Sequence, residues 1–436
     1  MAIEQLYQLY LQHAVISTDT RKIAPGSLFF ALKGDKFDAN TFAAQALEAG
    51  AAYVVIDDAT YRVSERYILV DDVLSTLQDL ARYHRKQLQI PVIGLTGTNG
   101  KTTTKELINA VLSQQFNTLA TQGNLNNHIG VPLTILSINN THQMAVIEMG
   151  ANHQKEIALL SSIAQPTHGL ITNVGKAHLE GFGGVEGVKI GKGELYDYLK
   201  DTKGTAFVNS DSPDLMLMKE TRGLVNVIYY GRLSALNTIS GNLADNAPYL
   251  ALNWKAVTDG KEHHTTTQLT GEYNLDNVLA AICIGNYFKL SPEQISAGIA
   301  GYQPQNNRSQ ILKTSTNTLI CDYYNANPSS MVVAIDNLSK MQATKKVMIL
   351  GDMFEMGVDA AAEHENVLKA ALATAGAKVI FVGKEFSLLK PDHNKATFYE
   401  TAEDAMAGLQ AEPITNSTVL IKGSRGMALE RLVTLL

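Results

Sequence analysis

A glycine-rich segment that could hold the phosphates of a nucleotide lies at residues 96–105, Thr-Gly-Thr-Asn-Gly-Lys-Thr-Thr-Thr-Lys. It directly follows a short apolar run, and the order of buried strand, glycine-rich turn and helix is the one that a nucleotide-binding P-loop requires. Gly97 and Gly100 would let backbone N–H groups approach phosphate oxygens, and the start of the helix would add partial positive charge. Lys101 would reach the β- and γ-phosphates, and the Thr102 hydroxyl would hold Mg²⁺. The segment therefore indicates that the protein binds ATP or GTP.

Three further polar segments follow apolar runs that we predict to be strands. They are 148–152, 172–181 and 209–211. Ligands of open α/β sheets bind at the carboxyl ends of the strands, so we expect these segments near the P-loop. Glu148 is a candidate Mg²⁺ ligand because this cation takes oxygen donors. From the residues alone, His178 could be a structural group, a metal ligand or a proton shuttle.

Two other segments carry side chains that could react with or bind a substrate. Lys189 and Lys192 lie three residues apart on a predicted helix over 185–199. A helical lysine is usually a solvated charge, but Lys192 lies between two glycines, and a lysine packed near an anionic site can lose its proton and react. The segment 122–132 predicts a loop that hydrogen-bonds a polar substrate. Its candidate ligands are Asn124, Asn126 and Asn127.

The elements that must position these side chains follow an α/β pattern with three domains. Residues 1–90 predict a small α/β domain, and 91–305 predict a central P-loop domain with a largely parallel sheet and an antiparallel insertion or edge at 232–270. Residues 306–436 predict a smaller, Rossmann-like α/β domain. Strands are expected at 92–95, 145–147, 169–172, 206–208, 319–321, 346–350, 379–382 and 419–421.

The composition restricts the function classes further. The chain has 436 residues, of which 45% are hydrophobic and 18% charged, with a net charge of −6, which argues against a nucleic-acid partner. No apolar run approaches the ~20 residues needed to span a membrane. Cys283 and Cys321 lie far apart in apolar surroundings, so we expect buried thiols rather than a disulfide or a zinc site. We expect a cytoplasmic enzyme that acts on a small or medium-sized substrate.

Taken together, these motifs resemble those of the Mur ligases, the ATP-dependent amide-forming enzymes of bacterial cell-wall synthesis. The resemblance rests on the segments 96–102, 173–181 and 271–281, and it covers essentially the whole chain. The branch that adds D-alanyl-D-alanine to UDP-N-acetylmuramoyl-tripeptide has the most similar distinguishing segments. In this chain those segments are 124–132, 148–152, 322–331, 350–357, 363–364 and 422–427.

The resemblance implies a reaction and a catalytic set. The substrate carboxylate would attack the γ-phosphate of ATP to give an acyl phosphate, which the amine of D-Ala-D-Ala would then attack. The implied catalytic residues are Lys101, Glu148, His178 and Lys192. Of two implied Mg²⁺ ions, one would use Thr102 and Glu148, and the second would use Glu148 and His178. The resemblance also implies a carbamylated lysine at Lys192, a modification that turns a cation into a carboxylate-like metal group.

The same resemblance assigns binding residues. The nucleotide-binding set is Thr96, Gly97, Thr98, Asn99, Gly100, Lys101, Thr102, Thr103, Asn274, Asn277, Arg308 and Asp322. The two asparagines would lie near the adenine and Asp322 on the ribose. The substrate-binding set is Thr20, Arg21, Asn124, Asn126, Asn127, Tyr324, Asn325 and Asn327. The first domain would bind the UDP part of the substrate, and the C-terminal domain would bind D-Ala-D-Ala and close over ATP, in a monomer.

Two other functions compete with this interpretation. One is another ligase of the same superfamily, such as the enzyme that adds the third peptide residue or a folate polyglutamating enzyme. The segment 324–328 and the UDP-type first domain argue against it. The other is a P-loop switch that binds nucleotide without forming a bond, which would have no need for Glu148, His178 and Lys192 around the phosphates.

Overall fold

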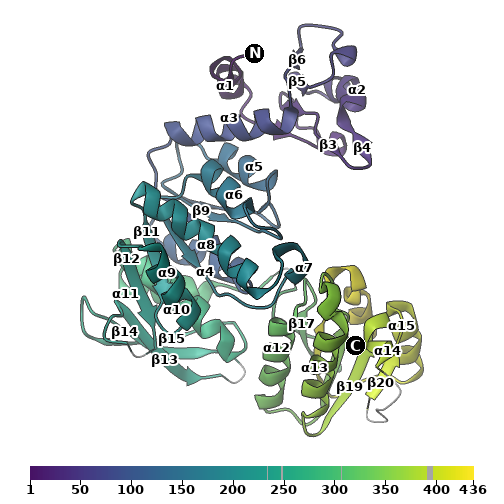
Figure 1. Cartoon of the computed structure of the whole chain (residues 1–436). Helices are drawn as coiled ribbons and strands as arrows, with labels where there is room; N and C mark the ends of the chain where they lie inside the picture. Colours follow the sequence, from purple (N-terminus) through teal and green to yellow (C-terminus); the bar gives the residue numbers. More distant parts are fainter. Residues whose placement is uncertain (233, 247–248, 306, 390–395) are drawn as a thin grey trace.

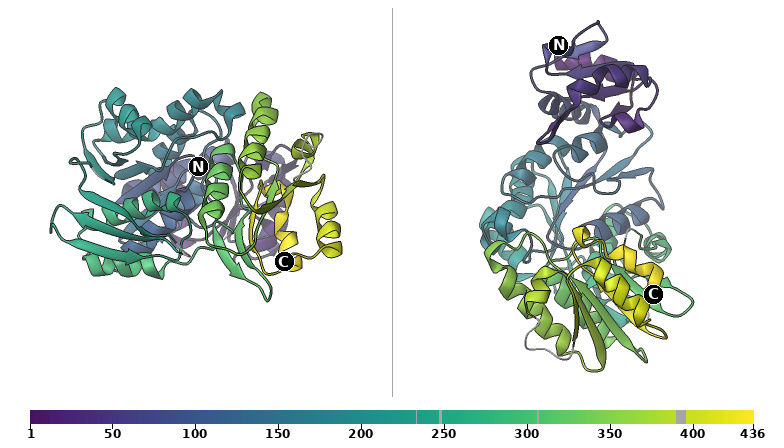
Figure 2. Two further views of the ribbon diagram at one scale, coloured as in Figure 1. Left: turned by 90° about the horizontal axis from the view of Figure 1, so that it is seen from below. Right: turned by 90° about the vertical axis from the view of Figure 1, so that its right-hand side faces the viewer.

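The chain folds into three successive α/β units, each built on its own sheet (Figure 1). The computed structural model describes residues 1–232, 234–246, 249–305, 307–389 and 396–436. The first unit lies at one end of the molecule, and the central and C-terminal units lie against each other at the other end (Figure 2). The predicted α/β class with mostly parallel sheets is confirmed. The domain boundaries near residues 90 and 305 stay a prediction.

The first unit is a parallel four-stranded sheet in the order β1-β2-β5-β6, with a separate β3-β4 hairpin. Its elements are α1 (Ile3–Gln12), β1 (Ile16–Ser17), η1 (Thr20–Lys22), β2 (Leu28–Phe30), β3 (Lys33–Gly34), β4 (Phe37–Asp38), η2 (Ala39–Phe42), α2 (Ala43–Glu48), β5 (Tyr53–Ile56), η3 (Ala59–Tyr61), β6 (Tyr67–Leu69) and α3 (Val73–Gln87). Asp72 caps α3 by accepting a hydrogen bond from the Ser75 N–H. Because α3 also packs against α5 and α6, it joins the first unit to the central one.

The central unit contains a nine-stranded sheet in the order β15-β14-β13-β12-β11-β10-β7-β9-β8. Its strands are β7 (Val92–Thr96), β8 (Thr118–Ala120), β9 (Met144–Glu148), β10 (His168–Ile171), β11 (Thr205–Asn209), β12 (Val227–Gly231), β13 (Ile239–Asp245), β14 (Ala251–Ala256) and β15 (Glu262–Thr266). Its helices are α4 (Lys101–Leu112), α5 (Gly130–Leu136), α6 (Glu156–Ala164), α7 (Leu179–Phe182), α8 (Val185–Thr202), α9 (Pro213–Arg222), η4 (Glu272–Asn274), α10 (Leu275–Tyr287) and α11 (Pro292–Gly301). The strands predicted here are confirmed, and β13 to β15 form an antiparallel edge of the sheet, one of the two arrangements expected for this segment.

Strand β7 lies inside this sheet, between β10 and β9, and all five of its residues are buried. Helices cover both faces, with α4, α10 and α11 on one and α6 and α8 on the other. Such two-sided burial explains why its sequence is a continuous apolar run rather than an alternating one. The parallel register aligns Leu95 with Glu148 and Thr96 with Ile171. The polar segments after β7, β9 and β10 therefore begin side by side at one edge of the sheet.

The C-terminal unit is a six-stranded sheet in the order β16-β17-β21-β18-β19-β20, in which only β16 is antiparallel to its neighbour. Its strands are β16 (Gln310–Lys313), β17 (Thr318–Asp322), β18 (Lys346–Gly351), β19 (Ala377–Val382), β20 (Ala396–Tyr399) and β21 (Thr418–Lys422). Its helices are α12 (Pro328–Lys340), η5 (Gly357–Asp359), α13 (Ala360–Leu372), α14 (Lys384–Leu388), α15 (Ala402–Ala411), η7 (Arg425–Met427) and η8 (Leu429–Leu435). Apolar clusters on both faces confirm the predicted doubly wound arrangement and its four predicted strands.

Two further findings concern the cysteines and the possibility of membrane-spanning helices. Both Cys283 and Cys321 are buried free thiols, as predicted. Among the described residues, no helix combines the length and the apolar character that crossing a bilayer would require.

A half-buried histidine at the start of β10 makes the stability of the central unit depend on pH. The His168 ring packs against Phe207, Tyr287 and Phe288, with ring centroids 5.1–6.2 Å apart. Burial lowers its pKa to about 4. The folded pKa thus lies below the unfolded value of about 6.5, so the unfolded chain takes up the proton first as the pH falls. The stability that depends on the uncharged His168 ring is fully present above about pH 6.5, and it is lost progressively between about pH 6.5 and pH 4.

We expect this histidine to cost on the order of 2 kcal/mol of stability at about pH 5, because one pKa unit corresponds to about 1.4 kcal/mol. His168→Gln removes the titrating group and should lose less stability than wild type between about pH 7 and pH 5. Urea unfolding midpoints of both proteins at the two pH values measure the difference. Equal losses would show that the ring is not protonated on unfolding.

Candidate active site

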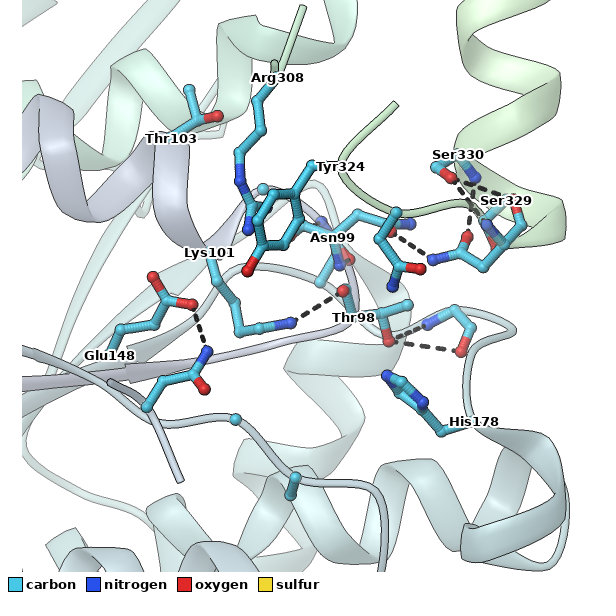
Figure 3. Close-up of a pocket in the computed structure, with 18 of the residues that line it drawn as sticks. Thr98, Asn99, Lys101, Thr103, Glu148, His178, Arg308, Tyr324, Ser329 and Ser330 are labelled. Atoms are coloured by element: carbon cyan, nitrogen blue, oxygen red, sulfur yellow. Dashed lines mark hydrogen bonds between the residues drawn. The ribbon is translucent and has the colours of Figure 1, made fainter. Parts of the chain in front are cut away.

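A cavity of about 900 Å³ lies between the central and C-terminal units. Figure 3 shows Lys101, Glu148 and His178 of the central unit on one side of it, and Arg308 and Tyr324 of the C-terminal unit on the other. The central residues come from the ends of β7, β9 and β10, which the sheet register brings together. Such a crevice at the carboxyl ends of parallel strands is where α/β proteins bind their ligands.

The P-loop at the bottom of this cavity requires both of its glycines. Gly97 and Gly100 have φ angles of 147° and 77°, in the region that L side chains rarely adopt. A Cβ atom on Gly97 would lie 2.0 Å from the Thr172 hydroxyl oxygen, and one on Gly100 would lie 2.7 Å from the Asn277 side-chain oxygen. Neither gap can hold a methyl group, so the loop closes only with glycine at both positions.

The loop is also held by the segment that follows β10. The N–H groups of Thr98 and Asn99 donate to the carbonyl and side-chain oxygens of Asn173, at 3.0 and 2.9 Å. The Thr172 hydroxyl donates to the Asn99 carbonyl oxygen at 2.6 Å. These hydrogen bonds come from another segment of the same chain. The fold itself therefore holds the loop in its conformation before any phosphate binds.

Lys101 is the cation of this loop. Its ammonium donates to the carbonyl oxygens of Gly97 and Thr98, at 2.7 and 3.0 Å, so it lies over the turn that would cradle a phosphate. Burial lowers its pKa to about 8, against the opposing effect of Glu148. A desolvated cation at this place interacts with an anionic ligand more strongly than one in water.

Glu148 is buried, with 1% of its surface exposed, and both oxygens of its carboxylate are held. Oε2 accepts a hydrogen bond from the Thr102 hydroxyl at 2.9 Å, and Oε1 accepts one from the Asn126 amide at 2.8 Å. A threonine hydroxyl and a carboxylate are hard oxygen donors, which suit Mg²⁺. Among the described residues there is no group of three His, Cys, Asp or Glu side chains that could hold a metal ion alone. Mg²⁺ is usually bound through one or two carboxylates together with waters and substrate phosphates.

His178 contacts a residue to which the sequence analysis gave no role. Its Nδ1 forms a short contact with a carboxylate oxygen of Glu355, from the C-terminal unit. Burial lowers the pKa of His178, and the neighbouring carboxylate raises it in part. The assignment of His178 to a second metal ion stays a prediction. Glu355 lies in the 350–357 motif, so the motif was visible in the sequence but this pairing was not.

Lys192 lies in α8 and is 2% exposed. Its ammonium donates to the Ala151 carbonyl oxygen at 3.1 Å and lies 4.9 Å from the Phe182 ring centroid. No ion pair among the described residues includes Lys192, whereas Lys189 on the same helix pairs with two carboxylates. Burial lowers the pKa of Lys192 well below its ordinary value. The amine is thus adjacent to Ala151 in the cavity wall, and its burial shifts its protonation equilibrium toward the uncharged form.

The C-terminal unit contributes a second group of predicted residues. The Arg308 guanidinium stacks on the Tyr324 ring at 3.8 Å, and its Nε atom is buried without a hydrogen-bond partner. Asp322 accepts hydrogen bonds from the Ser309 N–H at 3.1 Å and the Lys422 ammonium at 2.7 Å. Lys422 was not predicted as a site residue, although it begins the 422–427 motif.

The predicted asparagines gather at the same cavity. Asn277 accepts a hydrogen bond from the Thr104 hydroxyl at 3.0 Å and donates to Asn274 at 2.9 Å, so this pair packs on the P-loop helix. The Asn327 amide crosses between the units and donates to the Asn99 side-chain oxygen at 2.8 Å. The remaining predicted residues that line the cavity are Thr103, Asn124, Asn126, Asn127 and Asn325.

Other predicted residues lie elsewhere. Thr20 and Arg21 are on η1 in the first unit and do not line this cavity. Arg21 is exposed and pairs with Asp19 at 2.8 Å. Thr96 and Thr102 are buried beneath the loop rather than in the cavity wall. The cavity thus joins Lys101, Glu148 and His178 with most of the predicted nucleotide residues, whereas Lys192 lies behind Ala151 of its wall. The predicted UDP residues remain a separate prediction.

Comparison with known proteins identifies the relatives of this chain. Residues 13–85 match the model "Mur ligase family, catalytic domain", residues 95–285 match "Mur ligase middle domain", and residues 307–425 match "Mur ligase, glutamate ligase domain". Two similar curated proteins are the UDP-N-acetylmuramoyl-tripeptide–D-alanyl-D-alanine ligases of Escherichia coli and Bacillus subtilis. The first is 36% identical over 96% of this chain and 92% of its own length, and the second 34% identical over 98% and 93%.

The solved structures that are similar to this chain include two that are named MurF. MurF from Acinetobacter baumannii matches with a TM-score of 0.87 and 30% identity, over 96% of this chain and 92% of its own. MurF ligase from Thermotoga maritima in complex with ADP matches with a TM-score of 0.84 and 26% identity, over 96% of both chains. Full-length identity, three matching domain models and the same three-unit fold lead to one conclusion. This chain belongs to the Mur ligase family.

Proposed function

We propose that this protein is an ATP-dependent ligase that adds D-alanyl-D-alanine to UDP-N-acetylmuramoyl-tripeptide, in the synthesis of peptidoglycan precursors. One observation carries the proposal: Lys101, Glu148, Arg308 and Tyr324 face one cavity between two units. Support also comes from the relatives at 34–36% identity, all of whose names state this reaction. A nucleotide site open to a second unit suits a transfer between two substrates better than a switch.

The reaction follows from what these residues can stabilise. The terminal carboxylate of the tripeptide attacks the γ-phosphorus of ATP, so that an acyl phosphate forms and ADP leaves. The amine of D-Ala-D-Ala then attacks the acyl carbon, and the tetrahedral intermediate expels phosphate and loses a proton to give the amide. Lys101 offsets the charge that develops on the phosphoryl oxygens, in a site already shaped for it. Thr102 and Glu148 would hold Mg²⁺, which would neutralise phosphate charge.

Lys192 and His178 complete the proposed catalytic set. Carbamylation joins CO₂ to the uncharged amine of Lys192 and releases a proton, which creates an anion where the structure has a buried base. The low pKa and the absence of any ion pair to Lys192 in the described structure support this modification. His178 would join Glu148 in holding a second Mg²⁺. Its contact with Glu355 would then have to change as the units move.

The other units supply the substrates in this proposal. The first unit binds the UDP part through Thr20 and Arg21, and the C-terminal unit binds D-Ala-D-Ala and closes over ATP with Arg308 and Asp322. The bond between Asn327 and Asn99 supports such closure because it already links the C-terminal unit to the P-loop. We further propose that the protein is a cytoplasmic monomer with domains at 1–90, 91–305 and 306–436.

A phosphate-release assay tests the function directly. Purified protein should release phosphate from ATP only when UDP-N-acetylmuramoyl-tripeptide, D-Ala-D-Ala and Mg²⁺ are all present. Tripeptides with lysine or diaminopimelate at the third position, run in parallel, identify the preferred substrate. Phosphate release that does not depend on either substrate would instead indicate a nucleotide switch or a different ligase.

Lys101→Met should lower kcat by about 10²–10³-fold, because it removes the cation that stabilises the transferring phosphoryl group. The side chain keeps a similar length, so the fold and the thermal midpoint should be unchanged. The assay above measures the effect, and unfolding curves serve as its control. Activity near that of wild type would remove Lys101 from the mechanism.

Lys192→Ala should abolish amide formation while ATP binding survives. Its matched control is Lys189→Ala, which lies on the same helix but removes a lysine that is already paired with carboxylates. With ¹³C-labelled bicarbonate, the wild type and the control should show a carbamate carbon in the NMR spectrum, and Lys192→Ala should not. Unchanged ligation activity in the Lys192→Ala variant would contradict the assignment of a carbamate to Lys192.

A further inference from the structure

A second lysine on the P-loop helix has no role in the mechanism above. Lys105 lies three residues after Thr102, on the same face of α4, and its side chain is 0% exposed. Lysine is almost never fully buried unless it is paired. Its ammonium has two partners at 2.6 Å, the Thr121 carbonyl oxygen and the partly exposed carboxylate of Glu106. A charge removed from water in this way calls for an explanation beyond packing.

The partner residue Thr121 leads directly to Glu148. Thr121 is fully buried just after β8, and its N–H donates to the Val146 carbonyl oxygen in β9 at 3.0 Å. Its hydroxyl oxygen accepts a hydrogen bond from the Glu148 N–H at 3.0 Å. The ammonium of Lys105 therefore holds the residue that fixes the backbone of Glu148.

The same connection reaches both oxygens of the Glu148 carboxylate. One oxygen is held by Thr102, which shares α4 with Lys105. The other is held by Asn126, in the loop that starts just after Thr121. Lys105 thus joins the helix that carries one holder to the base of the loop that carries the other. Without Lys105, the helix that carries Thr102 would lose this link to the start of the loop that carries Asn126.

We propose that Lys105 is a positioning residue for the metal site: its buried ammonium fixes Thr121 and thereby orients Glu148 for Mg²⁺. This inference rests on the proposed function, in which Glu148 binds Mg²⁺ with ATP. Outer groups that orient a metal ligand commonly change metal affinity by about 10–100-fold when they are removed. Lys105 has this effect through Glu148, and it does not touch the substrate.

The test is the Mg²⁺ dependence of nucleotide binding in the full-length protein. A fluorescent ATP analogue is titrated without the other substrates, first in EDTA and then with rising MgCl₂. Lys105→Met keeps the length of the side chain but removes its charge. It should raise the Mg²⁺ concentration needed for half-maximal tightening by about tenfold and leave the affinity in EDTA unchanged. The control Glu106→Gln removes the negative charge beside the ammonium but keeps the bond of Lys105 to Thr121, and it should behave as wild type.

Each outcome separates this inference from its alternatives. A merely structural role would lower the thermal midpoint and weaken binding equally with and without Mg²⁺, which would overturn the proposal. If Lys105→Met does not fold, Thr121→Val removes the hydroxyl that holds Glu148 and should shift the Mg²⁺ dependence in the same direction; no shift would overturn it. A Mg²⁺-dependent wild type with unshifted variants overturns only the role of Lys105. If ATP binding by the wild-type protein does not depend on Mg²⁺, the proposed magnesium site is overturned, and the role of Lys105 is overturned as well.

Discussion

The parallel pairing of β7 with β9 and β10 is the constraint on which the candidate site depends. It places the P-loop, Glu148 and the segment after Ile171 at one edge of the sheet. Helices on both faces bury these strands, so a shift in register would break the packing of side chains on both faces and is disfavoured. The same burial that stabilises the sheet therefore fixes the relative positions of the chemical groups at its edge.

The site concentrates buried charge, and each charge has its own means of compensation. Glu148 is satisfied by a hydroxyl and an amide, Lys101 by two loop carbonyls, and Lys105 by a carbonyl and one carboxylate. Lys192 has only a carbonyl and an aromatic ring. Burying ionised groups costs free energy that packing must offset, which is common at catalytic sites. The least compensated of these groups, Lys192, is the one for which we propose a covalent modification.

Contacts between the central and C-terminal units make the cavity a joint product of both. Asn327 bonds to Asn99 of the P-loop, and Lys176 pairs with Glu363 at 2.6 Å. Such polar interfaces between units are compatible with relative motion, because few apolar contacts would be lost on opening. The proposed closure over ATP would tighten an interface that already exists rather than create a new one.

The sequence by itself determined the α/β class, the strands β7, β9, β10 and β11, the antiparallel segment within 232–270 and the P-loop, because apolar runs and glycine spacing are local signals. It also predicted part of the cavity lining, such as Asn124, Asn126 and Asn127 from a polar loop, and Asn327 once the motifs were compared with a known family. It did not predict the pairing of His178 with Glu355, the bond of Lys422 to Asp322, or the connection from Lys105 through Thr121 to Glu148. These contacts join residues 16 to 177 positions apart. Only the tertiary structure decided them, because no local pattern shows which distant side chains a folded sheet and its neighbouring unit bring into contact.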